Sequence, residues 1–412
     1  MPSGAEYVDV EHRAEFVDDI LAARHGRGVV LSFHAFEGVP ADLEARYRAM
    51  RETGAEVVKI AVAAGSLTES LRVASLGNGN EPRVLIGMGA AGIPSRVLAG
   101  RFGSCWTYAG EGIAPGQVDL DRMRRQFRFH EISDRTAVFG VLGAPIGHSL
   151  SPAMHNAGFQ ASGIDAVYLP LEAGGVDDFL TFARAVALRG ASVTAPFKEA
   201  VAARVVQQDA TSRAIGAINT LRRLDNGAWE GLNTDVPGLL APLAGRIGLT
   251  GTRATVLGAG GVARAAAFAL HGGGAAVTVC ARRPERAAEV AAVAPGTVAA
   301  PLPPKPGSWD LLVNTTPLGT WPEVEGSPLP DGPFDGRLVY DLVYNPRETR
   351  LLADAARAGC GTIGGLDMLV AQAVRQFTWW TGAKPSADLF RRAAEEDLER
   401  QGRQSPPAER PA

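Results

Sequence analysis

The sequence contains very little lysine: only four lysines stand among 41 lysine and arginine residues. A chain that uses arginine for nearly all of its positive charge is expected to keep lysine where an amine is needed. An amine can share its proton near neutral pH and can attack a carbonyl carbon, and a guanidinium can do neither. Lys305 and Lys384 each precede a proline and are predicted to lie in loops. Lys59 and Lys198 are therefore the lysines that suggest chemistry.

Cysteine is also scarce. Cys105, Cys280 and Cys360 are far apart in the sequence, and no cysteine pair or cysteine–histidine cluster occurs. An odd and scattered set argues against a disulfide framework and against a zinc site, and it fits a reducing compartment.

Long apolar runs and blocks of positive charge are lacking as well. No apolar run reaches the roughly 18 residues that a membrane helix needs, and the first residues lack a signal-peptide pattern. The net charge is -3, which argues against nucleic acid as a partner. The sequence therefore predicts a cytoplasmic protein that acts on small molecules and has neither a nucleic-acid nor a membrane partner.

Residues 1–128 contain five apolar runs that begin 22 to 28 residues apart, with stretches of helical character between them. This spacing is typical of repeated βα units, which form a parallel sheet with helices outside. We expect either an open sheet or about five strands of a (βα)8-type barrel. The runs are Tyr7–Val10, Val29–His34, Val57–Val62, Arg83–Gly89 and Cys105–Tyr108.

Residues capable of chemistry stand in or at the ends of these runs. His34 ends the second run, and Lys59 lies within the third, which is otherwise apolar. Because strand ends gather on one face of a barrel, the two side chains would be neighbours. A desolvated lysine can form a Schiff base with a ketone, and an adjacent histidine can move a proton. The alternative is that Lys59 pairs with a buried carboxylate and that His34 is a core histidine.

The segments Ser-Phe-His-Ala-Phe, Val-Lys-Ile-Ala-Val, Ser-Arg, Phe-Gly-Ser and Ala-Pro-Gly-Gln occur in this order. Their order and spacing resemble type I 3-dehydroquinate dehydratase. The resemblance implies that Lys59 forms the Schiff base and that His34 is the general base. It also implies that Arg96 and Gln117 bind the substrate. One departure is Ile113, which stands where the family has a serine.

A second departure is that the chain begins at what resembles the fourth strand of the family's barrel. Three strands of that barrel are not in this sequence, nor are the Glu and Arg residues with which the family holds its substrate. Three explanations stay open: a start placed too late, a remnant with a structural role, or a homodimer in which two chains complete one another.

Residues 129–137 are charged and are predicted to be a linker, and a second domain is predicted over 138–243. In this domain Ser149 and Ser151 precede a proline that suits the start of a helix. Their hydroxyl groups either cap that helix or hold a ligand rich in hydroxyls.

Further polar residues follow at the predicted strand ends of the second domain. They are Thr194, Lys198, Asn219 and Asp235. Amides, hydroxyls, one lysine and one aspartate suit a small ligand that has several hydroxyl groups and one anionic group. A carboxylate beside Lys198 would keep its amine charged and oriented.

Residues 244–361 have the pattern of a Rossmann domain. An apolar strand runs directly into Gly258, Ala259, Gly260 and Gly261 and then into an alanine-rich helix. Such a turn lets the backbone approach a pyrophosphate at the N-terminus of the helix. A site for NAD would have an acidic residue after the second strand. Arg282 and Arg286 follow that strand instead, which favours NADP, unless they are solvated arginines at the start of a helix.

The end of the chain is predicted to return to the second domain. A turn at Gly365 leads into a helix that carries Gln372, and residues 362–395 are predicted to complete the 138–243 domain. Residues 396–412 are polar and rich in proline, which predicts a disordered tail.

Residues 138–395 carry a set of motifs that is similar to shikimate dehydrogenase. The set is Gly-His-Ser-Leu-Ser-Pro-x-Met-His-Asn, Val-Thr-x-Pro-Phe-Lys, Gly-Ala-x-Asn-Thr, Asn-Thr-Asp, Gly-Ala-Gly-Gly, Asn-Thr-Thr-Pro-Leu-Gly, Asp-Leu-Val-Tyr-Asn-Pro and Gly-Leu-x-Met-Leu-x-x-Gln. The resemblance implies that Lys198 and Asp235 are the catalytic pair. It assigns shikimate to Ser149, Ser151, Thr194, Asn219, Tyr344 and Gln372. It assigns NADP to Gly258, Ala259, Gly260, Gly261 and Gly365, with Arg282 and Arg286 at the 2′-phosphate.

The two resemblances imply consecutive reactions of aromatic amino acid biosynthesis. A dehydratase makes 3-dehydroshikimate, and a dehydrogenase reduces it to shikimate with NADPH. The alternatives are a quinate/shikimate dehydrogenase of catabolism and a non-catalytic regulator or scaffold built from the same folds. The expected fold class is α/β, with a partial (βα)8-type barrel, an α/β substrate domain and a Rossmann domain that binds NADP.

Overall fold

The computed structural model describes residues 5–77, 79–110 and 115–404. Contacts divide the chain into two compact units. Unit 1 comprises Met1–Pro152 and Phe159–Phe197, and unit 2 comprises Ala153–Gly158 and Lys198–Ala412. This division differs from the predicted domains, because it passes through the segment 138–243. The first strands of that segment pack with the N-terminal sheet, and the rest packs with the Rossmann domain.

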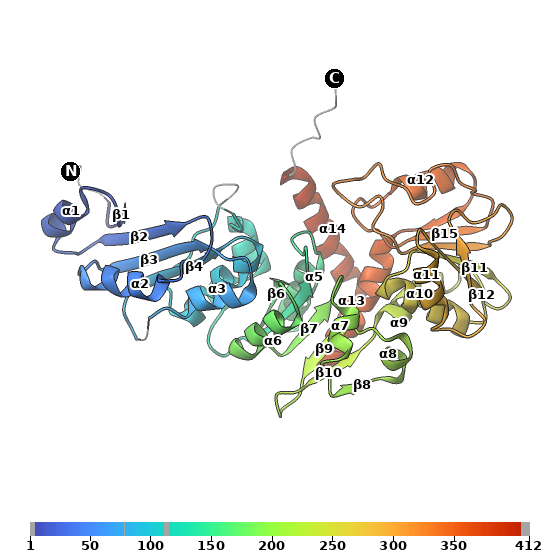
Figure 1. The fold of residues 1–412 in the computed structure, drawn as a ribbon, viewed down its shortest axis with the longest axis horizontal. Coiled ribbons are helices and arrows are strands. Elements are labelled where there is room, and N and C mark those ends of the chain that lie inside the picture. Colours follow the sequence, from blue (N-terminus) through green and yellow to red (C-terminus); the bar gives the residue numbers. More distant parts are fainter. Residues whose placement is uncertain (1–4, 78, 111–114, 405–412) are drawn as a thin grey trace, which may run out of the picture. The chain divides into compact units, whose positions relative to one another are not determined.

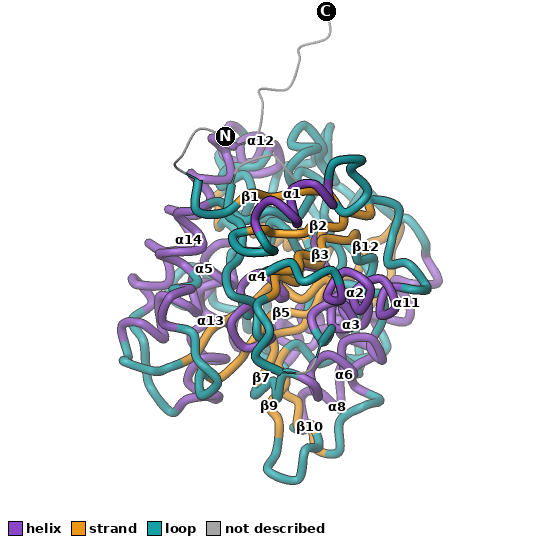
Figure 2. The backbone as a smooth tube through the Cα atoms, turned by 90° about the vertical axis from the view of Figure 1, so that its left-hand side faces the viewer, coloured by secondary structure: helices purple, strands orange, loops and turns teal. Residues whose placement is uncertain are grey.

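The N-terminal part of unit 1 is a parallel sheet in the order β1-β2-β3-β4. Figure 2 shows β1, β2 and β3 side by side. Leu31, Phe33 and Ile60 belong to the buried cluster that also takes in Leu43 and Tyr47 of α2. The strands are β1 (Val8–Glu11), β2 (Val29–Ala35), β3 (Val57–Ala63) and β4 (Arg83–Met88), and the helices are α1 (Val17–Arg24), α2 (Leu43–Glu52), α3 (Leu67–Ala74) and α4 (Ile93–Val97).

The fifth predicted strand, Cys105–Tyr108, was wrong. The segment forms one backbone hydrogen bond with β4, in which the amide of Cys105 donates to the carbonyl oxygen of Arg83 at 2.8 Å. Trp106 and Tyr108 then both pack against the buried cluster that contains Val84. Trp106 and Tyr108 stand at alternate positions and both cover one face of the sheet. The segment therefore has the apolar alternation of a strand, although it does not form one.

The remaining strands of unit 1 are parallel, with β5 (Ala137–Gly143) between β6 (Ala166–Glu172) and β7 (Gly190–Val193). The predicted linker thus contributes its last residue to β5. Asp178 on α6 (Val176–Ala185) accepts hydrogen bonds from the amides of Leu67 (3.1 Å) and Thr68 (2.7 Å), in the first turn of α3. This carboxylate therefore joins the β5–β7 part of unit 1 to the N-terminal sheet. Short helical turns lie at η1 (Ala90–Gly92), η2 (Ala99–Phe102), η3 (Arg122–Gln126) and η4 (Phe129–Glu131), and α5 spans Ser151–Ala161.

Unit 2 contains an antiparallel pair, β9 (Thr220–Arg223) and β10 (Trp229–Leu232), and β8 (Gln207–Gln208) pairs with β10. The helices of this part of unit 2 are α7 (Lys198–Ala202), α8 (Ala210–Ile215), α9 (Asp235–Leu243), α13 (Gly365–Thr381) and α14 (Ala387–Gln404) (Figure 1).

The rest of unit 2 is a parallel Rossmann-type sheet in the order β13-β12-β11-β14-β15-β16. The strand order reverses between β11 and β14, and ligands of such sheets bind outside the carboxyl ends of the strands at this point. The strands are β11 (Arg253–Leu257), β12 (Ala276–Ala281), β13 (Val298–Pro301), β14 (Leu311–Asn314), β15 (Leu338–Asp341) and β16 (Gly361–Ile363). The helices are α10 (Gly261–Gly272), α11 (Pro284–Ala291) and α12 (Arg350–Arg357).

The predicted disordered tail was wrong for residues 396–404, because α14 continues to Gln404. The buried side chain of Asp397 accepts hydrogen bonds from Arg400 (2.8 Å) and Gln401 (3.1 Å) and so supports the last turns of the helix. Residues 405–412 lie outside the described part of the chain. Among the described residues, no helix combines the length and the apolar character needed to cross a membrane.

Candidate active site

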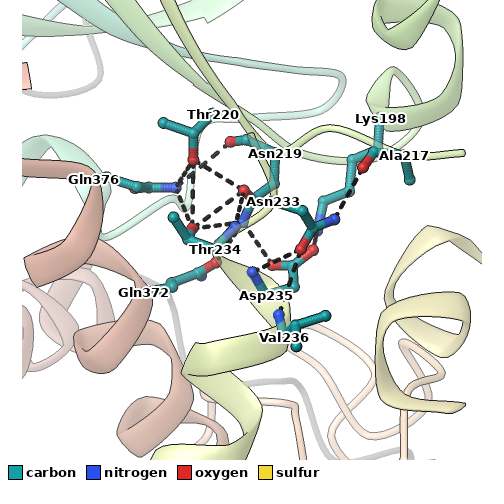
Figure 3. A network of polar contacts seen from close by, with 10 residues as sticks. All are labelled: Lys198, Ala217, Asn219, Thr220, Asn233, Thr234, Asp235, Val236, Gln372 and Gln376. Atoms are coloured by element: carbon teal, nitrogen blue, oxygen red, sulfur yellow. Dashed lines mark hydrogen bonds and ion pairs between the residues drawn. The ribbon is translucent and has the colours of Figure 1, made fainter. Parts of the chain in front are cut away.

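A buried ion pair is the centre of the site in unit 2 (Figure 3). Lys198 opens α7 and Asp235 opens α9, and their Nζ and Oδ2 atoms are 2.7 Å apart. Only 11% of the lysine side chain and 1% of the aspartate side chain are exposed. Water therefore does little to screen the two charges, and the pair holds the amine in a defined place.

The loop residue Asn233 explains why the carboxylate of Asp235 is held at this point. Its Oδ1 atom accepts the amides of Asp235 (2.9 Å) and Val236 (3.4 Å), which are free donors in the first turn of α9. Its Nδ2 atom donates to the carbonyl oxygen of Ala217 at 3.0 Å. The backbone that carries Asp235 is thus capped and tied to the neighbouring loop.

Asn219 engages the other oxygen of the carboxylate. Its Nδ2 atom donates to Asp235 Oδ1 at 2.7 Å and to Gln372 Oε1 at 3.1 Å, and its own Oδ1 accepts the amide of Thr234 at 2.7 Å. Asp235 is therefore bonded through both oxygens, with the cation on one and an amide on the other. These two contacts fix the orientation of the carboxylate.

The structure brings together four of the residues predicted for the site in unit 2, namely Lys198, Asn219, Asp235 and Gln372. Tyr344 follows β15 in the same unit and is partly exposed, and desolvation raises the pKa of its hydroxyl, which is therefore protonated at neutral pH.

The predicted residues Ser149, Ser151 and Thr194 belong to unit 1. Ser149 Oγ accepts the amide of Ser151 at 3.3 Å, so its hydroxyl takes part in capping α5, as one of the two sequence interpretations expected. Thr194 approaches the end of β5 so closely that a Cβ atom at Gly143 would lie 2.5 Å from the Thr194 methyl group. A side chain at Gly143 would therefore displace the Thr194 and Ile146 side chains.

The glycine-rich turn between β11 and α10 has the form of a dinucleotide cradle. Gly258 has a φ of +117°, and a Cβ atom there would lie 2.4 Å from Thr315 Oγ1, so only glycine fits. The turn and Gly260 leave the N-terminus of α10 accessible. The residues present therefore fit a pyrophosphate, which binds backbone amides at such a terminus.

Lys198 lies against this turn. A Cβ atom at Gly261 would be 3.5 Å from both Cβ and Cδ of Lys198, which is ordinary van der Waals contact. The stem of the lysine thus packs on the first residue of α10. The Lys198 side chain and the predicted dinucleotide site are therefore direct neighbours.

The predicted 2′-phosphate residues lie beyond β12, next to the glycine-rich turn. Arg282 is exposed, and Arg286 forms an ion pair with Glu289 at 2.7 Å. Gly365 opens α13, and a Cβ atom there would be 2.3 Å from the carbonyl oxygen of Leu342, so its lack of a side chain has a packing reason.

His34 and Lys59 lie on the same face of the N-terminal sheet, because Ser32 pairs with Lys59 and His34 is two residues further along β2. Lys59 Nζ bonds Asp9 Oδ2 at 2.8 Å and lies 4.6 Å from the centre of the Tyr108 ring. Lys59 therefore pairs with a carboxylate, but the alternative interpretation expected a buried one, and Asp9 on the edge strand is exposed. These two side chains share one face but each has its own partner.

His34 is not a core histidine, since 31% of its side chain is exposed. Its Nδ1 atom lies 2.7 Å from Glu11 Oε2, and the second oxygen of Glu11 lies 2.9 Å from His12 Nδ1. A carboxylate in this position orients the imidazole and fixes its tautomer.

Arg96 and Gln117 lie near the segment that covers this face. Arg96 is buried, which lowers the pKa of its guanidinium to about 10, and it donates to the carbonyl oxygen of Tyr108 at 3.4 Å. Gln117 packs against Gly110, where a Cβ atom would lie 2.8 Å from its Nε2. Ile113, which replaces the family's serine, lies outside the described residues.

Sequence reasoning missed Gln376 on α13, which donates to Thr220 Oγ1 and Thr234 Oγ1 behind Asn219. A signal was present, because Gln376 stands four residues after Gln372 and so lies on the same face of the helix. No group of three or more His, Cys, Asp or Glu side chains in the described part of the chain could hold a metal ion.

Three family models match the chain. Type I 3-dehydroquinase matches residues 1–134, the shikimate dehydrogenase substrate binding domain matches residues 141–221, and the shikimate 5′-dehydrogenase C-terminal domain matches residues 365–395. Their order agrees with the two resemblances found in the sequence.

Similar proteins also divide the chain into a dehydroquinase part and a shikimate dehydrogenase part. The chain is 32% identical to the chloroplastic bifunctional 3-dehydroquinate dehydratase/shikimate dehydrogenase of Arabidopsis thaliana, over 95% of this chain and 70% of that protein. It is 44% identical to a shikimate dehydrogenase (NADP(+)) of Moorella thermoacetica, over 65% of this chain and 96% of that protein.

A solved structure matches the second part of the chain. It is the shikimate 5-dehydrogenase of Thermus thermophilus in complex with NADP(H) and shikimate, with 39% identity and a TM-score of 0.58 over 63% of this chain and 99% of that chain. The predicted family and cofactor are thereby confirmed. The chain belongs to the shikimate dehydrogenase family of NADP-dependent oxidoreductases, in the form that carries a type I 3-dehydroquinase domain ahead of the dehydrogenase.

Proposed function

We propose that the chain catalyses the reversible, NADPH-dependent reduction of 3-dehydroshikimate to shikimate. The observation that carries this proposal is the buried pair of Lys198 and Asp235, whose lysine stem lies on Gly261 of the dinucleotide turn. Reduction of a ketone needs a hydride at carbon and a proton at oxygen. A fixed ammonium beside a dinucleotide cradle can provide the second of these.

Lys198 is the proton donor in this mechanism. When bound, NADPH supplies the hydride to the ring carbonyl carbon. Lys198 Nζ gives a proton to the carbonyl oxygen, so that the ketone becomes a secondary alcohol, and the same amine takes the proton back during oxidation. Asp235 holds the amine in place and balances its charge while the oxygen acquires negative charge.

The remaining residues of the proposal bind the two ligands. Hydroxyl and amide groups would hold the hydroxyl-rich ring, from Ser149, Ser151, Thr194, Asn219, Tyr344 and Gln372. The pyrophosphate would lie on Gly258, Ala259, Gly260 and Gly261, with Gly365 near the cofactor and Arg282 and Arg286 at the 2′-phosphate.

The choice between biosynthesis with NADP and catabolism with NAD is tested at Arg282. We expect Arg282→Ala to lower kcat/KM for NADP by about 10- to 100-fold, because a hydrogen bond to a charged phosphate is lost, and to change the value for NAD little. The measurement is shikimate oxidation followed by reduced cofactor, with each cofactor varied. Arg392→Ala, at an exposed arginine of α14, is the matched control. An equal loss with both cofactors would contradict a 2′-phosphate contact, and faster turnover of quinate with NAD would favour the catabolic alternative.

A second candidate function is dehydration of 3-dehydroquinate in the N-terminal sheet. The placement of His34 and Lys59 on one face, with Glu11 orienting His34, favours it. We expect borohydride to trap 3-dehydroquinate as a reduced Schiff base on Lys59, seen as an adduct by peptide mass spectrometry. Lys59→Arg should give no adduct, because a guanidinium does not form an imine.

The yield of this adduct distinguishes a sheet that two chains complete to a barrel from a sheet that has only a structural role. If two chains complete one barrel, the yield should rise with protein concentration in the range where a homodimer forms. Wild-type protein that gives no adduct at any concentration would contradict the dehydratase function and leave the sheet with a structural role.

A further inference from the structure

Gln376 forms a second layer behind the site. It lies on α13 and is 3% exposed. Its Nε2 atom donates to Thr220 Oγ1 at 3.1 Å, to Thr234 Oγ1 at 3.3 Å and, more weakly, to the carbonyl oxygen of Asn219 at 3.5 Å. Figure 3 shows Gln376 on the opposite side of Asn219 from Lys198. Gln376 thus acts on groups that in turn contact the ion pair.

His155 on α5 supplies the other end of this layer. It is fully buried, and its ring lies 5.1 Å from that of Trp380, 5.5 Å from that of Phe390 and 6.2 Å from that of Phe377. Burial lowers the pKa of His155 to about 3, and a hydrogen bond with Gln376 opposes this shift. The imidazole is therefore neutral at neutral pH.

The hydrogen bonds from Gln376 to Thr220 and from Thr220 to Asn219 run in one direction. Gln376 Nε2 is the donor to both Thr220 and Thr234. The hydroxyl of Thr220, which accepts from Gln376, donates to Asn219 Oδ1 at 2.9 Å. Asn219 Oδ1 therefore accepts from Thr220, while Asn219 Nδ2 donates to Asp235 Oδ1 at 2.7 Å and to Thr234 Oγ1 at 2.9 Å. If the amide of Asn219 were turned over, two oxygen acceptors would stand against each other next to Asp235.

We propose that Gln376 is a positioning residue for the dehydrogenase reaction. It sets the orientation of the Asn219 amide, and through Asn219 it sets the place of Asp235 and of the Lys198 amine. The proposal rests on the roles of Lys198 and Asp235 stated above. It goes beyond them because Gln376 contacts neither of the two residues. An amide in this position acts through a hydrogen-bond network whose members depend on one another.

The first test is Gln376→Met, which keeps the length and volume of the side chain and removes both polar atoms. We expect kcat for shikimate oxidation to fall by about tenfold, with the KM for NADP unchanged within about twofold, because one hydrogen bond that holds the network is lost. Gln376→Glu keeps the shape of the side chain and replaces the donating NH2 group by an acceptor oxygen, and we expect a fall of the same size. Val370→Ala is the control, since Val370 is buried on the same helix and outside the network. It should lower the melting temperature and leave kcat unchanged, and a fall in kcat of the same size in this control would overturn the proposal.

The decisive test is a double-mutant cycle with Asn219→Ala. If Gln376 acts through Asn219, Gln376→Met should have almost no further effect on kcat when Asn219 is already alanine. The same tenfold fall in both backgrounds would overturn the positioning role. A normal kcat for Asn219→Ala alone would instead contradict the proposed function of the network around Asp235, so the two failures can be told apart.

Discussion

Replacing Lys198 by alanine is expected to lower kcat for shikimate oxidation by about 10³-fold, because the variant has no group to accept and return the proton. NADP binding should be retained, since the turn from Gly258 to Gly261 stays intact. The measurements are the shikimate-dependent formation of NADPH and a binding titration with NADP. Lys198→Met should behave in the same way and keeps the apolar stem that lies on Gly261.

The small number of lysines supplies a matched control for this experiment. Lys305 and Lys384 are exposed, and alanine at either position should leave kcat unchanged. Turnover by Lys198→Ala at the wild-type rate would sink the assignment of Lys198 as the proton donor. Loss of NADP binding in Lys198→Met would show that the lysine acts on the cofactor instead.

The second large effect is expected at Asp235. In Asp235→Asn the ammonium of Lys198 loses its counter-charge while it stays buried, and removal of one partner of a buried ion pair costs about 3–5 kcal/mol of unfolding free energy. We expect a lower midpoint of urea denaturation together with a fall in kcat of about 10²-fold. Both would be measured on the same preparation.

A double variant separates the two effects of this substitution. Lys198→Met combined with Asp235→Leu removes both charges, and replacing a whole buried pair by apolar residues is often neutral for stability. Stability should therefore return towards that of the wild type, while activity stays lost. If the double variant is as unstable as Asp235→Asn, the stability loss does not come from an uncompensated charge.

The sequence was most informative where chemistry and backbone geometry require particular residues. The turn at Gly258 could be predicted from its glycines, and the structure gives the reason for them: a side chain at position 258 would collide with Thr315. Lys198 was noticeable in the sequence because the chain uses arginine for nearly all of its other positive charges. The partnership of Lys59 with Asp9 was not predictable, because it depends on the register between strands whose residues are 50 positions apart.

Other features depend on tertiary packing that the sequence does not display. The run Cys105–Tyr108 has the alternation of a strand, but its apolar side chains cover a sheet face. Residues 396–404 have the composition of a tail, yet the buried Asp397 supports a helix there. Gln376 has the spacing of an inward-facing residue, but only the structure reveals that its partners are Thr220 and Thr234.

The contact made by Asp178 has a consequence for how this gene fusion can be taken apart. Its carboxylate completes the first turn of a helix that lies 110 positions earlier in the chain, at Thr68. Arg101 in η2 likewise donates to the carbonyl oxygen of Val186, which follows α6. A dehydrogenase that begins at residue 137 would leave Asp178 and the carbonyl oxygen of Val186 without these partners. Shortening the protein to the dehydrogenase is therefore expected to lower its stability by the contribution of these hydrogen bonds.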